Sequence, residues 1–214
     1  MTRRATLKSP ARGEARREAI LAAAAQILES EGITAMSARR IAEQAHASKE
    51  TIYAHFGGRR GLLEALVQRQ SAETNRRLRS ALDEPGGQPV RAVLEEAVRG
   101  LLTLLTGARS LALNRAAIAG VPGDRELADA LYAAGRATTG PLFEALLAQA
   151  ARDGELTCPD SVEAFGVLFG LAVRDAQITA LLGAGKEWTQ QAIQARAAHA
   201  VALFYRLYGS PERS

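Results

Sequence analysis

Apolar side chains near the start of the chain recur at the spacing of an amphipathic helix. The members of this apolar face, spaced i, i+1, i+4, i+7 and i+8, are Ile20, Leu21, Ala24, Ile27 and Leu28. The pattern begins at Glu14, and Gly32 closes it because glycine readily adopts the left-handed conformation that follows a helix end. It predicts a helix over residues 14–31, preceded over residues 1–13 by a basic, disordered arm.

Two shorter helices and a long one are predicted next. Ser37 and Ser48 are the expected N-caps of the two short helices, because a serine side chain can accept hydrogen bonds from the free amides of a first turn. His46 and Ala47 form a tight connection between them, and Gly57-Gly58 ends the second. The predicted ranges are 38–45, 49–56 and, for the long amphipathic helix, 59–82.

Beyond residue 83 the chain has the pattern of further helices separated by glycine and proline. The loop over residues 83–89 holds two prolines and two glycines, and Gly140-Pro141 is expected to kink the helix that contains it. The predicted ranges are 90–106, 109–119, 124–152, 160–182 and 187–208. Alanine is abundant while β-branched and aromatic residues are scarce, which favours helices over strands. We therefore predict an all-α fold.

The positive charge is concentrated at the N-terminus. Residues 1–60 hold eleven Lys and Arg against six Asp and Glu, whereas residues 61–214 hold sixteen against seventeen. Most of the excess comes from Arg3, Arg4, Lys8, Arg12, Arg16 and Arg17. Such a segment can neutralise DNA phosphates and release their counterions, although a solubilising tail would have the same composition.

Several classes of protein are excluded by what the sequence lacks. No apolar run reaches the 18 or so residues of a membrane span, and no secretory signal is recognisable, so we expect a cytoplasmic protein without membrane contact. The single cysteine, Cys158, excludes an intrachain disulfide and a cysteine-based metal site. The histidines, at 46, 55 and 199, form no metal-ligand spacing, and no phosphate-binding loop appears, so we expect no metal, no cofactor and no enzyme activity.

Residues 36–66 carry the pattern with the clearest function. Two short helices joined by a tight turn can place the second one in the major groove of DNA. The stretch closely resembles the TetR family of bacterial regulators, whose pattern fixes residue types at constant spacing. The matching positions are Ile41, Ala42, Ala45, Ser48, Thr51, Ile52, Tyr53, His55, Phe56 and Leu62. The resemblance implies an N-terminal three-helix domain of the helix-turn-helix type over residues 14–60 and a helical ligand-binding and dimerisation domain over residues 61–214.

Three positions depart from the family pattern. The usual Gly-Val of the turn is His46-Ala47, although histidine tolerates a positive φ better than most residues. Arg59 replaces a lysine and keeps its phosphate-binding charge. Glu50 favours the helix dipole but would repel a nearby phosphate.

The resemblance also implies which side chains meet DNA. The expected DNA-binding residues are Arg39, Ser48, Lys49, Thr51, Tyr53, His55 and Arg59. Lys49 and Thr51 are the better candidates for base edges, and Tyr53 and His55 for the DNA backbone. Three alternatives stay open: Ser48 is only a helix cap, Tyr53 is part of the core, or His55 is a packing residue.

Residues 101–182 resemble the C-terminal domain of AefR-like regulators, through LALNRAAIAGVPGDRELADALYAAG and DGELTCPDSVEAFGVLFGL. This implies a pocket for a small effector, which we expect to be apolar or aromatic. The candidate pocket residues are Asn114, Arg115, Tyr132, Arg136, Phe143, Phe165, Phe169 and Arg174. Arg174 and Asp175 interrupt an apolar helix, so they must pair, reach solvent or meet a polar ligand, and we favour a structural ion pair between the two over contact with a ligand.

The last two predicted helices are apolar around much of their circumference, which favours a homodimer that binds a pseudo-palindromic operator. The expected function is that of a sequence-specific transcription regulator of double-stranded DNA, namely a repressor released by a small molecule. The alternatives are a DNA-binding regulator that senses oxidation through Cys158, and a helical enzyme.

Overall fold

The computed structural model describes residues 10–210 except 85, 121–122, 124 and 186. Regular structure in these residues is helical, and the isolated β-bridge between Leu156 and Gly209 belongs to no strand. The chain divides into two compact units, Met1–Leu66 and Val67–Ser214. The prediction of an all-α fold is confirmed.

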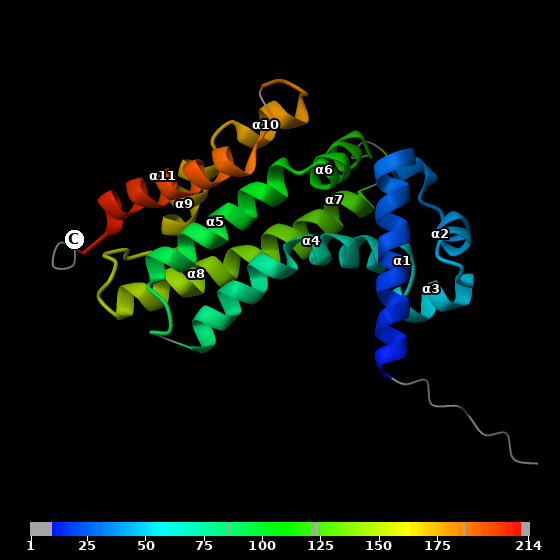
Figure 1. Cartoon of the computed structure of the whole chain (residues 1–214), viewed down its shortest axis with the longest axis horizontal. Coiled ribbons are helices and arrows are strands. Elements are labelled where there is room, and N and C mark those ends of the chain that lie inside the picture. The colour runs from blue at the N-terminus through cyan, green and yellow to red at the C-terminus, as the bar shows by residue number, and fades with distance from the viewer. Residues whose placement is uncertain (1–9, 85, 121–122, 124, 186, 211–214) are drawn as a thin grey trace, which may run out of the picture. The chain divides into compact units, whose positions relative to one another are not determined.

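The described part of the N-terminal unit contains three α-helices, a 3₁₀ turn and the start of a fourth α-helix (Figure 1). In chain order they are α1 (Pro10–Glu31), the 3₁₀ turn η1 (Ile33–Ala35), α2 (Ala38–Gln44), α3 (Lys49–Phe56) and α4 (Arg59–Asp83). All five apolar residues that predicted the first helix are buried, with Ile41, Ile52 and Phe56 completing the small core. The unit extends to Leu66 rather than to residue 60, since Leu62, Leu63 and Leu66 in the first turns of α4 are buried too.

The start of the chain differs from the prediction of an arm over residues 1–13. Residues 1–9 lie outside the described residues, but residues 10–13 form the first turn of α1. Pro10 suits this place because its fixed φ fits the first helical position, where the missing amide hydrogen has no intrahelical partner. The helix thus begins four residues before the predicted start at Glu14.

The C-terminal unit is built from the rest of α4 and a set of further helices (Figure 1). They are α5 (Val90–Thr106), α6 (Ala108–Gly120), α7 (Glu126–Leu131), the π-helical turn η2 (Tyr132–Arg136), α8 (Ala137–Arg152), α9 (Ser161–Val173), α10 (Ala176–Leu181) and α11 (Gln190–Tyr208). Helix α11 packs against α5 and α9, and α8 packs against α9. Their shared core includes the fully buried Leu94, Leu102, Phe143 and Phe204.

Two predicted helices are divided in the structure. The segment predicted over 124–152 is interrupted at the π turn η2, before the Gly140-Pro141 pair at which we expected a kink, and Pro141 lies inside α8. The segment predicted over 160–182 breaks at Arg174, whose φ of 45° ends α9. This break leaves Arg174 and Asp175 exposed, and Asp175 pairs with Arg196 of α11 at 3.9 Å, so the predicted Arg174–Asp175 pair was wrong. Because both side chains are exposed to water, their charges carry no desolvation cost that a mutual ion pair would have to offset.

Candidate nucleic-acid interface and internal cavity

The two short helices of the N-terminal unit are capped as their serines predict. The Ser37 hydroxyl oxygen accepts a hydrogen bond from the Arg40 amide (3.1 Å), and the Ser48 hydroxyl oxygen accepts one from the Thr51 amide (3.1 Å). Ser48 also shares a hydrogen bond with the Thr51 hydroxyl (3.0 Å). The capping role of Ser48 is confirmed, and each cap satisfies an amide that the helix itself leaves free. A contact of Ser48 with DNA stays a prediction.

One face of α3 points to solvent. Ile52 and Phe56 are buried, whereas Lys49 is exposed and Tyr53, one turn later, keeps 57% of its surface accessible. The alternative that places Tyr53 in the core is therefore wrong. Thr51 and His55 are half-buried at the margin of this face. Arg39 on α2 and Arg59 at the start of α4 are exposed as well, so the expected DNA-binding side chains are accessible to different degrees.

Glu50 places a negative charge on the same exposed face. Hydrogen bonds from its own backbone amide and from the Ser48 hydroxyl lower the pKa of its carboxyl group. The group is therefore ionised at neutral pH and suits the positive end of the helix dipole. Because Lys49 and Glu50 are adjacent, the first turn of α3 presents both signs of charge.

The turn between α2 and α3 has an unusual backbone that a distant arginine supports. His46 has a φ of 50°, in the left-handed region that non-glycine residues rarely occupy. Arg16 of α1 donates one hydrogen bond to the Ala45 carbonyl (3.1 Å) and another to the His46 carbonyl. A planar guanidinium suits two neighbouring carbonyls, because its donors lie side by side in a fixed geometry. Arg16 thereby holds the turn that sets the start of α3.

This role corrects the interpretation of the basic N-terminal residues as one phosphate-binding segment. The Arg17 guanidinium lies 5.4 Å from the centre of the Phe56 ring and 3.8 Å from the Glu14 carboxylate. Arg16 and Arg17 thus contact their own unit, whereas Arg12 is exposed. The three remaining basic residues of the arm, Arg3, Arg4 and Lys8, lie outside the described residues.

Gly61 is a further residue that the sequence analysis did not single out. A Cβ atom at this position would lie 1.9 Å from the Phe56 carbonyl oxygen, so no larger residue fits without moving α3 or the start of α4. Glycine destabilises a helix interior, so a glycine three residues after Gly57-Gly58 could have suggested that the backbones of two helices approach closely there.

A cavity of about 230 Å³ that is open to solvent on one side lies within the C-terminal unit. Its walls come mainly from apolar residues of α5 and α9, including Leu101, Leu105, Phe165 and Phe169. Four of the candidate pocket residues line it, namely Asn114, Arg136, Phe165 and Phe169. Helix α4 adds Gln70 and Ser71, which the sequence analysis missed because nothing in their local pattern separates them from an ordinary polar helix face.

The other four candidates lie elsewhere. Arg115 donates hydrogen bonds to the carbonyls of Leu181 (2.9 Å) and Ala180 (2.8 Å) and so caps the end of α10. Tyr132 is 68% exposed, and Arg174 is exposed at the break after α9. Phe143 stacks behind Phe165 in the core, with ring centres 5.0 Å apart. These four residues therefore do not line the cavity, contrary to their assignment. For Phe143 the reason is that the spacing of aromatic residues along a helix does not distinguish a core residue from a residue of a cavity wall.

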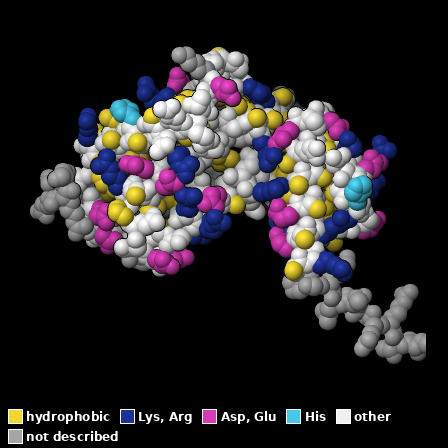
Figure 2. Space-filling view, viewed as in Figure 1, with side chains coloured by type: hydrophobic (Ala, Val, Ile, Leu, Met, Phe, Trp, Pro, Cys, Tyr) yellow, Lys and Arg dark blue, Asp and Glu magenta, His cyan; other side chains and the backbone are white. Residues whose placement is uncertain are grey.

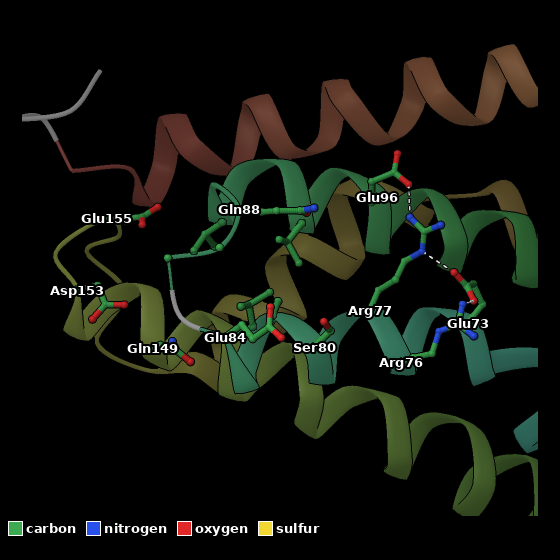
Figure 3. Close-up of a pocket in the computed structure, with 16 residues that line it drawn as sticks. Glu73, Arg76, Arg77, Ser80, Glu84, Gln88, Glu96, Gln149, Asp153 and Glu155 are labelled. Carbon is green, nitrogen blue, oxygen red and sulfur yellow. Dashed lines mark hydrogen bonds and ion pairs between the residues drawn. The ribbon is translucent and has the colours of Figure 1, made fainter.

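A larger hollow of about 600 Å³ lies beside α4, α5 and α8, and it has a different character (Figure 3). It is lined mostly by charged and polar side chains. Arg77 bridges Glu73 (2.8 Å) and Glu96 (2.6 Å), and Arg76 also pairs with Glu73. The two arginines of the hollow are thus paired within the protein, while Glu84, Asp153 and Glu155 leave the lining with an excess of negative charge, so the hollow resembles a solvated groove more than an enclosed ligand site.

Charges of both signs are also mixed over the face of the C-terminal unit seen in Figure 2. Among the described residues, no group of three or more His, Cys, Asp or Glu is arranged to hold a metal ion. Among the same residues, no helix combines the length and the apolar character that a membrane crossing requires.

Two family models match the chain. The model of bacterial regulatory proteins of the tetR family matches residues 20–66, and the model of the C-terminal domain of AefR-like transcriptional repressors matches residues 92–210, more than half of the chain. The chain belongs to the TetR family. It is therefore a DNA-binding transcription regulator, of a family whose members act as dimers, bind small-molecule ligands and are not enzymes.

Solved structures of other regulators share the fold. A transcriptional regulator from Agrobacterium tumefaciens is 31% identical, with a TM-score of 0.76 over 96% of this chain and 97% of that chain. A regulator from Mesorhizobium loti is 23% identical, with a TM-score of 0.75 over 92% and 98% of the two chains. The flavonoid-responsive regulator FrrA is 24% identical, with a TM-score of 0.63 over 94% and 100%. Among curated proteins, none matches the chain.

The Arg16 contacts generate a first prediction for this TetR-family protein. Arg16→Gln should lower the free energy of unfolding by about 1–3 kcal/mol, because two carbonyl groups lose a charged donor. Operator affinity should fall with it, since the turn that orients α3 loses its support. Chemical denaturation and fluorescence anisotropy with labelled operator DNA measure the two effects.

Arg12→Gln is the matched control, because it removes the same charge from the exposed side of α1. His46→Gly in the Arg16→Gln background should restore part of the stability and part of the affinity, since glycine adopts a positive φ without steric cost. Equal effects of Arg12→Gln and Arg16→Gln would show that charge, and not the turn, is responsible.

Proposed function

We propose that this regulator is a repressor that binds a pseudo-palindromic operator as a homodimer and leaves it when a small molecule occupies the cavity. The observation that supports this most directly is the pairing, in one chain, of an exposed α3 face with a largely apolar cavity. The first can enter the major groove of DNA, and the second can hold a ligand. Such a regulator acts where the bacterial chromosome is, in the cytoplasm.

In the proposed complex, α3 is the recognition helix. Lys49, nearest its N-terminus, and Thr51 reach for base edges, while Tyr53 and His55 meet the DNA backbone. Arg39 and Arg59 flank the helix and bind phosphates, for which a guanidinium offers two parallel donors. The negative charge of Glu50 repels nearby phosphates and so restricts the orientations in which α3 can bind to DNA.

Release from the operator requires that the ligand bind more tightly to the DNA-free state than to the DNA-bound state. Helix α4 has residues in both units: Arg59 begins it, and Gln70 and Ser71 further along line the cavity. A shift of α4 on ligand binding would therefore alter the position of a residue that we propose to bind DNA. The flavonoid-responsive FrrA, which shares the fold, is in its own case a regulator that responds to a small molecule.

We place the dimer interface on α9 and α11. Val162, Gly166 and Gly170 form an exposed row along α9, and a Cβ atom on either glycine would meet no other atom within 4 Å. On α11, Ala195, Ala198 and Leu207 are exposed. Rows of small residues let two helices approach closely, and a two-fold axis between them would match the symmetry of a pseudo-palindrome.

The alternative of an oxidation sensor has little physical support. Cys158 is buried, and burial raises the pKa of its thiol. Its Sγ lies 3.7 Å from the Leu147 carbonyl oxygen, toward which the thiol points. A redox-sensing cysteine needs the opposite conditions, namely access to solvent and a lowered pKa.

A second prediction tests the recognition helix and the direction of regulation. Lys49→Ala and Tyr53→Ala should each weaken binding to an operator, selected from a random DNA pool by the wild-type protein, by about tenfold, as expected when an interaction with DNA worth ~1–3 kcal/mol is removed. Wild-type protein should reduce transcription in vitro from a promoter that carries this operator, and neither variant should do so at the same concentration. Arg152→Ala, an exposed change in the C-terminal unit, is the control. Unchanged affinity of both variants would refute our assignment of α3, and increased transcription would refute repression.

A third prediction concerns the charges before α1. Replacing Arg3, Arg4 and Lys8 with Gln should reduce the slope of log affinity against log salt by about 0.9 for each phosphate that is no longer neutralised, while preserving the preference for the operator. The matched control replaces three exposed arginines of the C-terminal unit, Arg79, Arg125 and Arg152. A slope that does not change would show that the arm has no part in DNA binding.

A fourth prediction tests the dimer interface. Gly166→Arg and Gly170→Arg should leave the fold of each chain intact, because both positions have free space, but should convert the dimer to a monomer. Light scattering coupled to size-exclusion chromatography measures the mass in solution. Ala145→Arg, at an exposed position of α8, should stay dimeric. If both glycine variants remain dimers, the interface lies on another surface.

A further inference from the structure

The cavity of the C-terminal unit has an unbalanced charge. Among the residues that line it, Arg136 is charged, and the others are apolar or neutral polar residues. No carboxylate belongs to the described lining, and within the described part of the chain no ion pair joins Arg136 to an acidic residue. A ligand in the cavity would therefore meet the positive charge of Arg136, which no acidic residue of the described lining balances.

Arg136 is an exposed residue at the edge of the cavity, and two aromatic rings hold its side chain there. The central carbon of the guanidinium lies 4.7 Å from the centre of the Phe165 ring and 5.9 Å from that of Phe169. Rings attract a cation through their electron-rich faces, but they carry no net charge and leave its N–H donors unused. The guanidinium is thus oriented while its capacity for an anion is retained.

The backbone around Arg136 is shaped to make room for it. A Cβ atom on Gly140 would lie 2.3 Å from Arg136 Nη1 and 3.5 Å from Phe165, so a side chain there would displace the guanidinium. Arg136 itself ends the π-helical turn η2, and such turns occur frequently at functional sites. The absence of a side chain at Gly140 thus leaves space for the guanidinium beside Phe165.

A buried donor of α4 also lines the cavity. Gln70 Nε2 is buried and has no hydrogen-bond partner among the residues that the structure describes. Other polar groups nearby are paired: the Thr139 hydroxyl donates to Asn75 Oδ1 (2.9 Å), and the Asn114 amide donates to the Ser110 carbonyl (2.8 Å). Because an unpaired buried donor is costly, Gln70 marks a place for an acceptor atom of the occupant.

We propose that the effector is a compact aromatic carboxylate. Its carboxylate binds the Arg136 guanidinium, its ring packs among Leu101, Leu105 and Phe169, and an oxygen atom accepts from Gln70. The volume of about 230 Å³ lies below the range of pockets for drug-sized ligands, so the occupant has one or two rings rather than a long chain. This inference rests on the proposed function, because it names the ligand of the cavity that we assign to the effector.

The fifth prediction uses three probes of nearly equal shape that differ in charge. Isothermal titration of the full-length protein with 2-naphthoate, 2-naphthamide and 2-naphthylmethylamine should show the carboxylate binding at least about tenfold more tightly than the amide, and the amine binding most weakly. Arg136→Gln should abolish the difference between carboxylate and amide, and Arg136→Lys should retain part of it. Gly140→Ala should weaken 2-naphthoate binding although it leaves the charge unchanged. Arg152→Gln removes an arginine outside the cavity and should behave as wild type.

The outcomes separate this inference from the proposed function. Equal binding of carboxylate and amide, a preference that survives Arg136→Gln in a protein of normal thermal stability, or binding of none of the probes would overturn the inference. If 2-naphthoate binds with the expected dependence on Arg136 but operator affinity does not change, ligand-induced release is refuted while the inference holds. If the amide binds as well as the carboxylate and releases DNA, the proposed function holds and the inference fails.

Discussion

The orientation of α3, the helix that we propose to bind DNA, depends on a left-handed residue in the turn between α2 and α3. Only four residues separate the end of α2 from the start of α3, so the chain must reverse sharply, and His46 takes the positive φ that the reversal needs. For a non-glycine residue the left-handed conformation costs about 1–2 kcal/mol. Arg16 offsets this cost from another helix by binding the two carbonyls of the turn. The orientation of the α3 face, with Lys49 and Tyr53 on it, follows from a contact made by α1.

Two arginine side chains of the C-terminal unit are also held in fixed positions, but by different kinds of contact. Arg115 binds the last carbonyls of α10 and is thereby occupied, whereas Arg136 is held by two rings that leave its donors unused. An arginine bound to carbonyls is a structural element, since its hydrogen bonds are satisfied within the protein. An arginine on aromatic rings has fixed geometry and free donors, which is the condition for recognising an anion.

The sequence pattern predicted those features of the fold that depend on residues close together in the chain. The range of α3 was predicted to the residue, because Ser48 caps it and Gly57 ends it, and the five apolar positions of α1 are buried as their spacing requires. The Arg16 contact could not be predicted in this way, since it joins residues 29 and 30 positions apart and nothing near Arg16 distinguishes it from a phosphate-binding arginine. The break at Arg174 and the π turn before α8 escaped for a related reason: tertiary packing decides where a long apolar helix is interrupted. Of the residues that line the cavity, Asn114, Arg136, Phe165 and Phe169 were predicted, whereas those of α4 and α5 were not.

A compact cavity also limits how a ligand can act on DNA binding. Coupling between two sites amounts to about 1–3 kcal/mol in typical allosteric proteins, and it must come from contacts that differ between the two states. Apolar packing of one or two rings changes little when a cavity wall moves slightly, because dispersion contacts are numerous and individually weak. A charge-assisted hydrogen bond depends strongly on distance and angle, and it is worth about 1.5–3 kcal/mol. In the complex that we propose, the contact of the ligand with Arg136 would therefore be the interaction best suited to carry the coupling, because it is both strong and sensitive to geometry.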